Sequence, residues 1–192
     1  MLKKHMIAIA AFACLVAVNA NAQIGSGWTP YSPSVTLQTR GCGAAHGLTF
    51  TLNCAATSGD NRAELRYGDI TSAQNQFEGT VVVNSMAGDR ISLKQVHPLT
   101  GGWVLIALKK PGLLYDVHSG STLANYTIGT PVRINTIVNT KARTCQIYIN
   151  GSLVITDTNG VPPLYDKLGV YRTSSGKGPV SATWSNIRFW KK

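Results

Sequence analysis

The feature that most constrains the fold of this chain is a repeated alternation of apolar and polar residues with a period of two. An apolar side chain occupies every second position over 48–54, and the same spacing returns over 145–149. Successive side chains of a strand point to opposite faces, so this period is typical of strands with one buried face. No convincing amphipathic helix longer than two turns is found. The sequence therefore predicts an all-β protein.

Turn signals between these segments predict short strands that form a sandwich. The Asn150-Gly151 step separates two alternating segments, and it predicts a hairpin because both turn residues need a positive φ. About ten to twelve short strands predict two antiparallel sheets packed face to face, while 23–33 is predicted as an irregular entry. Further strands are predicted over 77–86, 89–97, 102–109, 112–118, 132–139, 166–172 and 180–190.

The first residues have the features of an export signal. Two lysines precede a short apolar stretch over 6–18, and Ala20-Asn21-Ala22 fits a cleavage site of small residues. We therefore expect a signal peptide over 1–22 and one folded domain over 23–192, secreted to the periplasm or the medium, with no membrane span after cleavage. A lipoprotein acylated at Cys14 is the alternative, although the residues before Cys14 fit a lipobox poorly.

The charge of the predicted mature chain is strongly positive. Without the two lysines of the signal peptide, 16 Lys and Arg stand against 8 Asp and Glu, a formal net charge of +8. A basic exported protein often binds a polyanion, although a positive surface can also serve solubility alone. Nucleic acid is not the expected partner, because the chain has no run of five basic residues and no nucleic-acid-binding motif.

Three cysteines remain after signal cleavage: Cys42, Cys54 and Cys145. Export permits a disulfide, and three cysteines allow three single pairings. Cys42 and Cys54 flank a short polar and glycine-rich segment, so we hypothesise that they pair and that Cys145 is a buried core thiol. No metal site or cofactor is expected, because the histidines are scattered and neither C-x-x-C nor H-x-x-x-H occurs.

The first of three polar segments is Arg62-Ala63-Glu64-Leu65-Arg66. On a strand, Arg62, Glu64 and Arg66 share one face, and Ala63 and Leu65 share the other. Two guanidinium groups beside a carboxylate form a positive surface that suits a sugar carboxylate.

The second segment is Gln95-Val96-His97. Gln95 and His97 share a face, and a histidine can exchange a proton near neutral pH. The apolar Ile91 and Leu93 have the same parity, so either a bulge intervenes or a loop covers this part of the strand.

The third segment places Tyr165, Lys167, Gly169 and Tyr171 on one face of a strand. A glycine on a polar face lets a ligand approach the backbone closely. Each of the three segments, taken alone, also fits an ordinary exposed strand face. The functional argument therefore depends on their combination.

In this chain order, the segments resemble the motif strands of the alginate lyases of polysaccharide lyase family 7. The family patterns are R-[ST]-E-L-R, Q-[IV]-H and Y-F-K-A-G-x-Y-x-Q, and this chain has RAELR, QVH and YDKLGVYRT. The resemblance spans roughly 60–190 and implies a β-jelly roll of two antiparallel sheets with a concave glycan-binding face. The chain departs from the patterns at Ala63, Asp166, Leu168 and Thr173, and the mature chain is short for the family.

The resemblance implies a lyase that cleaves a polyuronate, first of all alginate, by β-elimination. Arg62 and Gln95 would neutralise the sugar carboxylate while the proton at C5 is removed. His97 and Tyr171 would transfer the protons, with Tyr171 as the acid and either residue as the base. Residues implied to bind the substrate or to orient these groups are Glu64, Arg66, Tyr165 and Lys167.

Two other functions stay open at this point. A lyase of another polyuronate, such as polyglucuronate, would use the same residues, and a non-catalytic lectin-like module would need no proton-transfer pair. A glycoside hydrolase is disfavoured, because it generally needs two positioned carboxylates and Glu64 and Glu78 are the only glutamates of the mature chain. The expected partner is thus an acidic polysaccharide, and a monomer is the default assembly.

Overall fold

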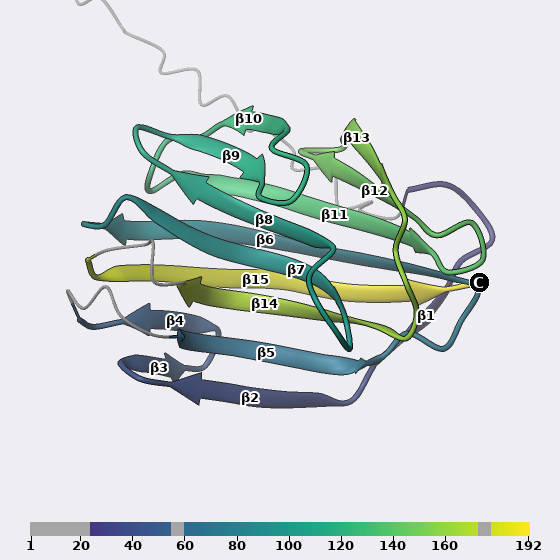
Figure 1. The fold of residues 1–192 in the computed structure, drawn as a ribbon, viewed down its shortest axis with the longest axis horizontal. Coiled ribbons are helices and arrows are strands. Elements are labelled where there is room, and N and C mark those ends of the chain that lie inside the picture. The colour runs from purple at the N-terminus through teal and green to yellow at the C-terminus, as the bar shows by residue number, and fades with distance from the viewer. Residues whose placement is uncertain (1–23, 55–59, 173–177) are drawn as a thin grey trace, which may run out of the picture.

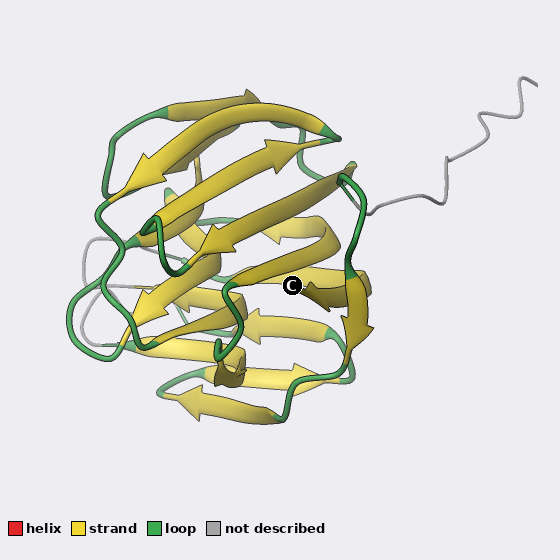
Figure 2. Ribbon diagram, turned by 90° about the vertical axis from the view of Figure 1, so that its right-hand side faces the viewer, coloured by secondary structure: helices red, strands yellow, loops and turns green. Residues whose placement is uncertain are grey.

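The computed structural model describes residues 24–54, 60–172 and 178–192. The predicted signal peptide and Thr173 lie outside these residues. Every regular element in the described part of the chain is a β-strand, and the strands form two antiparallel sheets packed face to face (Figures 1 and 2). The all-β sandwich predicted from the period of two is therefore confirmed.

The first sheet contains eight strands. Its central strands, β6 and β15, are also its longest, and the short β1 (Thr29–Tyr31) pairs with β15 outside the main path. The main path runs through β13 (Ser152–Thr158), β12 (Thr144–Ile149), β11 (Pro131–Asn139), β6 (Gln74–Met86), β15 (Val180–Lys191), β4 (Thr49–Leu52) and β3 (Gly43–His46).

The second sheet contains seven strands and carries all three motif segments. Its order is β10 (Thr122–Asn125), β9 (Leu113–Asp116), β8 (Val104–Lys109), β7 (Arg90–Pro98), β14 (Leu164–Arg172), β5 (Asn61–Asp69) and β2 (Val35–Arg40). Because β14 lies between β5 and β7, segments far apart in the sequence become neighbours (Figure 1).

The core lies between the sheets and is built from the apolar positions of the alternating strands. Phe77 and Trp184 of the first sheet are fully buried and meet edge to face, with ring centroids 6.0 Å apart. Val96 and Leu168 of the second sheet are also fully buried. Their burial fixes which face of β7 and β14 points outward, and so it places the polar residues of the motifs on the outer face.

Two local predictions are confirmed. Asn150 and Gly151 have φ values of 51° and 90° and join β12 to β13. Cys42 and Cys54 form a disulfide, and Cys145 is a buried free thiol. Burial raises the pKa of the Cys145 thiol far above its ordinary value.

Four short strands were not predicted: β1, β2, β3 and β10. The prediction of an irregular segment over 23–33 is wrong for Thr29–Tyr31, which pairs with the end of β15. Of the six residues of β2, five are exposed and one is partly buried. Such strands are held by backbone hydrogen bonds to one neighbour, so their side chains have no need to alternate. No helix among the described residues is long and apolar enough to cross a membrane.

Candidate active site

The pairing of β5, β14 and β7 brings the three motif segments together. On β14, Lys167 lies opposite Arg66 on one side and Gln95 on the other, while Tyr171 lies opposite Arg62. Tyr165 lies opposite His97 at the other end. The eight predicted site residues therefore occupy one face of three adjacent strands.

A bulge in β7 resolves the conflict in parity between its two halves. Ile91 and Leu93 point into the core, and the pairing with β8 shifts between Ser92 and Lys94. After the shift, Val96 takes the inward position. The bulge thus turns Gln95 and His97 to the outer face. Of the two explanations offered by the sequence, a bulge or a covering loop, the structure has the bulge.

Directly beneath the site, the bulge buries a lysine, Lys94, that no sequence pattern singles out. The Lys94 ammonium donates to a carboxylate oxygen of Asp166 and, at 2.9 Å, to the carbonyl oxygen of Gln95. Its Nζ also lies 4.5 Å from the centroid of the Phe77 ring. The departure from the family pattern at Asp166 is therefore matched by a cation on the neighbouring strand.

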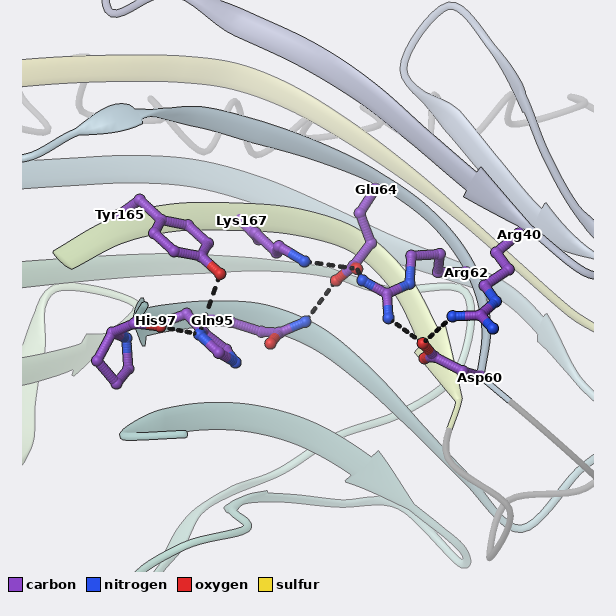
Figure 3. Close-up of polar contacts among 9 residues, drawn as sticks. Arg40, Asp60, Arg62, Glu64, Gln95, His97, Tyr165 and Lys167 are labelled. Atoms are coloured by element: carbon purple, nitrogen blue, oxygen red, sulfur yellow. Dashed lines mark hydrogen bonds and ion pairs between the residues drawn. The ribbon is translucent and has the colours of Figure 1, made fainter. Parts of the chain in front are cut away.

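Glu64 is the centre of the polar contacts on the outer face (Figure 3). It is almost fully buried and accepts a hydrogen bond from the side-chain amide of Gln95. Its other oxygen lies 3.5 Å from Lys167 Nζ and 3.8 Å from Arg62 Nη1. Burial raises the pKa of Glu64, and these three neighbours oppose that rise. Glu64 thus orients three predicted site residues, although it does not contact Arg66.

Asp60 is a site residue that sequence reasoning missed. It lies just before β5, forms an ion pair with Arg62 and contacts Arg40 Nη1 at 3.1 Å (Figure 3). The Arg62 guanidinium in turn lies 5.0 Å from the centroid of the Tyr171 ring. Burial and the negative charge of Asp60 raise the pKa of Tyr171, and Arg62 opposes them. The resting Tyr171 is therefore a protonated phenol near neutral pH.

His97 is held by two contacts at one ring nitrogen. Its Nδ1 lies within hydrogen-bond distance of the Pro98 carbonyl oxygen and 3.1 Å from the Tyr165 hydroxyl. Because a carbonyl oxygen only accepts, Nδ1 carries the proton of the neutral ring and Nε2 keeps its lone pair. Burial lowers the pKa of His97, and nearby Lys167 lowers it further. The neutral, proton-accepting form therefore predominates at neutral pH.

Arg66 and Lys167 flank the ring of Tyr165. The Arg66 guanidinium lies 4.0 Å from the ring centroid and pairs with Asp69 at 2.8 Å. Lys167 Nζ lies 5.9 Å from the same ring, and burial lowers the pKa of this ammonium despite Glu64. These residues form an aromatic and cationic surface beside the proton-transfer groups.

Arg172 does not belong to the site. It is buried on the face of β14 opposite to Tyr171. Its guanidinium donates to the Cys54 carbonyl oxygen at 3.2 Å and lies 3.0 Å from the Cys54 sulfur. Arg172 therefore stabilises the segment closed by the disulfide.

Gly169 is explained by strand packing. Its φ is 141°, and a Cβ at this position would lie 2.3 Å from the carbonyl oxygen of Ala63 on β5. The glycine therefore allows β5 and β14 to approach, which differs from the ligand approach that the sequence suggested.

A cavity of about 310 Å³ opens beside the proton-transfer groups. It gives Gln95, His97 and Tyr171 a common hollow that a sugar ring could enter. A larger cavity of about 520 Å³ lies at the packing of β1 and β15 and contains none of the predicted site residues. The other residues that line the smaller cavity are Gly101, Gly102, Val104, Leu105, Val117 and His118. No group of three or more metal-binding side chains occurs within 24–54, 60–172 and 178–192.

Comparisons with known proteins place the fold. No protein-family model matches the chain, and no curated protein matches its sequence. Among solved structures, an alginate lyase from Corynebacterium sp. gives a TM-score of 0.64 at 16% identity, covering 79% of this chain and 82% of that chain. The alginate lyase AlgAT5 of polysaccharide lyase family 7 gives 0.60 at 17% identity, covering 80% and 81%.

Two further structures show how widely the fold is used. The alginate lyase AlyC3 in complex with dimannuronate gives a TM-score of 0.57 at 10% identity, covering 73% of both chains. A sialidase gives 0.63 at 12% identity, covering 82% of this chain but only 17% of its own. The chain thus has the jelly-roll fold of the alginate lyases, as the motifs implied. Because this fold also occurs within a sialidase, the function must be argued from the site.

Proposed function

We propose that this protein is a polysaccharide lyase that cleaves a polyuronate, first of all alginate, by β-elimination. One observation carries the proposal: Arg62, Gln95, His97 and Tyr171 project from one face of three adjacent strands, three of them around a common hollow. A binding module needs cations and hydrogen-bond donors, but it has no need of a neutral imidazole and a protonated phenol in the same hollow.

The first step is the removal of the proton at C5 of a uronate. That proton is weakly acidic beside a charged carboxylate, because the product is an enediolate-like dianion. Arg62 supplies a cation and Gln95 an amide donor to neutralise the sugar carboxylate as this charge develops. Glu64 holds both side chains, so their donors are oriented before the substrate arrives.

The second step is the transfer of protons to and from the sugar. The free lone pair on His97 Nε2 suits the base, since Nδ1 is engaged by the Pro98 carbonyl oxygen. The raised pKa of Tyr171 suits the acid that protonates the departing sugar oxygen. The pair of electrons left at C5 forms the C4–C5 double bond as the bond from C4 to that oxygen breaks.

The substrate class follows from charge and from the neighbouring structures. A net charge of +8 on the predicted mature chain attracts a polyanion and makes its binding sensitive to salt. Dimannuronate, the ligand of the similar AlyC3 structure, is a uronate that the cations of this site would suit. We also propose from the sequence that the chain is secreted after cleavage of residues 1–22 and acts as a monomer.

The test is the ultraviolet absorbance of the conjugated double bond that β-elimination creates and hydrolysis does not. We expect it to rise with alginate, and Tyr171→Phe and His97→Ala to abolish the rise. Tyr148→Phe is the matched control, because Tyr148 lies on β12 of the other sheet. A rise with polyglucuronate alone would change the polymer but not the reaction. No rise with either polymer, together with salt-sensitive retention on both, would favour a glycan-binding module.

A further inference from the structure

Asp60 directly precedes β5, and it is contacted by one arginine from β5 and one from the adjacent strand β2. Its Oδ2 contacts Arg40 Nη1 of β2 at 3.1 Å and forms an ion pair with Arg62 Nη2 of β5. Arg40 and Arg62 are themselves opposite each other in the pairing of β2 with β5. One carboxylate therefore bridges two guanidinium groups on adjacent strands.

This bridge is linked to Tyr171 through Arg62. The Arg62 side chain is 21% exposed, against 70% for Arg40, and its guanidinium lies 5.0 Å from the Tyr171 ring centroid. The charged or titratable groups that face Tyr171 are Asp60, Arg62 and Glu64 from the β5 side, His97 from β7, and His118 across the hollow. Within that set Asp60 and Glu64 are the carboxylates, and Glu64 already binds Gln95 and Lys167.

An ordinary surface ion pair would contribute little to the stability of the fold at this position. Asp60 differs from such a pair in two respects. It is held from two sides, and one of its partners lies over the ring of the proposed acid. Its removal should therefore change the chemistry of Tyr171 more than the stability of the fold.

We propose that Asp60 is a positioning residue of the lyase site: by bridging Arg40 and Arg62 it holds the Arg62 guanidinium over Tyr171, and its own negative charge offsets that guanidinium beside the phenol. This inference rests on the proposed lyase function. It also implies that the sugar carboxylate shares Arg62 with Asp60 when it binds.

The experiment replaces Asp60 with Asn, which keeps the shape and removes the charge. Without that charge Tyr171 ionises at lower pH, and the reaction needs the protonated phenol. We therefore expect the alkaline limb of the kcat/KM profile to move to lower pH by roughly half to one pH unit, with KM for alginate unchanged or lower. Asp60→Glu should restore the limb toward its original position.

Asp69→Asn is the matched control. It breaks a comparable ion pair on the same strand, that of Arg66 with Asp69 at 2.8 Å. It changes the net charge by the same amount, and the pair that it breaks does not include Arg62. An unmoved alkaline limb in Asp60→Asn, or an equal movement in Asp69→Asn, would overturn the inference.

A readout independent of catalysis separates this inference from the proposed function. The Tyr171 phenol can be followed by NMR titration of protein carrying ¹³C-labelled tyrosine, with Tyr171→Phe to assign its signal. The Tyr171 signal should titrate at lower pH in Asp60→Asn than in the unmodified protein, even if no polymer is cleaved. An unchanged titration would refute the link between Asp60 and Tyr171, and it would do so whether or not the protein is a lyase.

Discussion

Replacing Lys94 with Met tests the ion pair that lies between the site and the core. The Lys94 side chain is fully buried and that of Asp166 is 3% exposed, so neither charge has access to water. Besides Asp166, the Lys94 ammonium contacts the Gln95 carbonyl oxygen and lies over the face of the Phe77 ring. Removing the ammonium would leave the Asp166 carboxylate buried without its cation.

The expected cost follows from this geometry. Breaking one side of a buried ion pair typically costs about 3–5 kcal/mol, because the remaining charge stays desolvated. That is a large part of the roughly 5–15 kcal/mol that stabilises a typical domain. Replacing both partners by apolar residues of similar volume removes the desolvation penalty as well, and it is often neutral or stabilising. Lys94→Met and Asp166→Leu should each be strongly destabilising, and the double variant should be close to the unmodified protein.

The unmodified protein, the two single variants and the double variant form a double-mutant cycle. The free energy of unfolding of each is measured by equilibrium unfolding in urea with the disulfide intact. A coupling free energy of several kcal/mol is expected, well above the roughly 0.3–0.5 kcal/mol scatter of independent sites. Single variants that lose less than about 1 kcal/mol, or a double variant that loses the sum of both, would refute the reasoning. The Gln95 carbonyl contact adds a second readout, because the single variant Lys94→Met should also weaken β-elimination by loosening the bulge.

Three further predictions concern other parts of the molecule. Gly169→Ala should lower the free energy of unfolding in urea by roughly 3 kcal/mol or more, because the new Cβ would meet the backbone of β5. Gly120 has a φ of 72° in open space, so Gly120→Ala should cost only about 1 kcal/mol. Equal losses in the two variants would contradict this explanation. Because burial lowers the pKa of His97 from 6.5, activity should fall with acidification only below about pH 6.5. An acidic limb of the kcat/KM profile that lies above that value would exclude neutral His97 as the base. Replacing Cys42 and Cys54 together with Ala should cost about 3 kcal/mol, as expected for a bridge with a sequence separation of 12, and a loss below about 1 kcal/mol would be inconsistent with that.

The sequence predicted the long strands well because burial on one face imposes a period of two. It failed at β1, β2, β3 and β10, where pairing through the backbone leaves the side chains exposed or irregular. The order of strands in the sheets could not be read from periodicity at all. The resemblance of the three motifs to a known family implied a jelly roll with a concave glycan-binding face, but the position of β14 between β5 and β7 came only from the structure.

The site was predicted in part for the same reason. Its outward-facing residues had a recognisable spacing, and the bulge of β7 was one of two stated alternatives. Asp60 gave no signal, because it lies outside the motif and becomes important only when β2 brings Arg40 beside it. Lys94 was missed because a regular strand would point it to the outer face, away from the core residues Ile91 and Leu93. The bulge turns its side chain inward instead. Long-range pairing and local irregularity thus explain both omissions.

The pairing of charges in the site determines how a polyanion would have to bind. Four cations at the site are already matched with carboxylates: Arg40 and Arg62 with Asp60, Arg62 and Lys167 with Glu64, and Arg66 with Asp69. Four cations and three carboxylates give this surface a local charge near +1, so most of the net positive charge of the chain lies elsewhere. Long-range attraction would therefore concentrate the polymer at the protein without binding it tightly at the site. A sugar carboxylate must then share or exchange the partners of Arg62, which favours the dianionic transition state over the singly charged ground state.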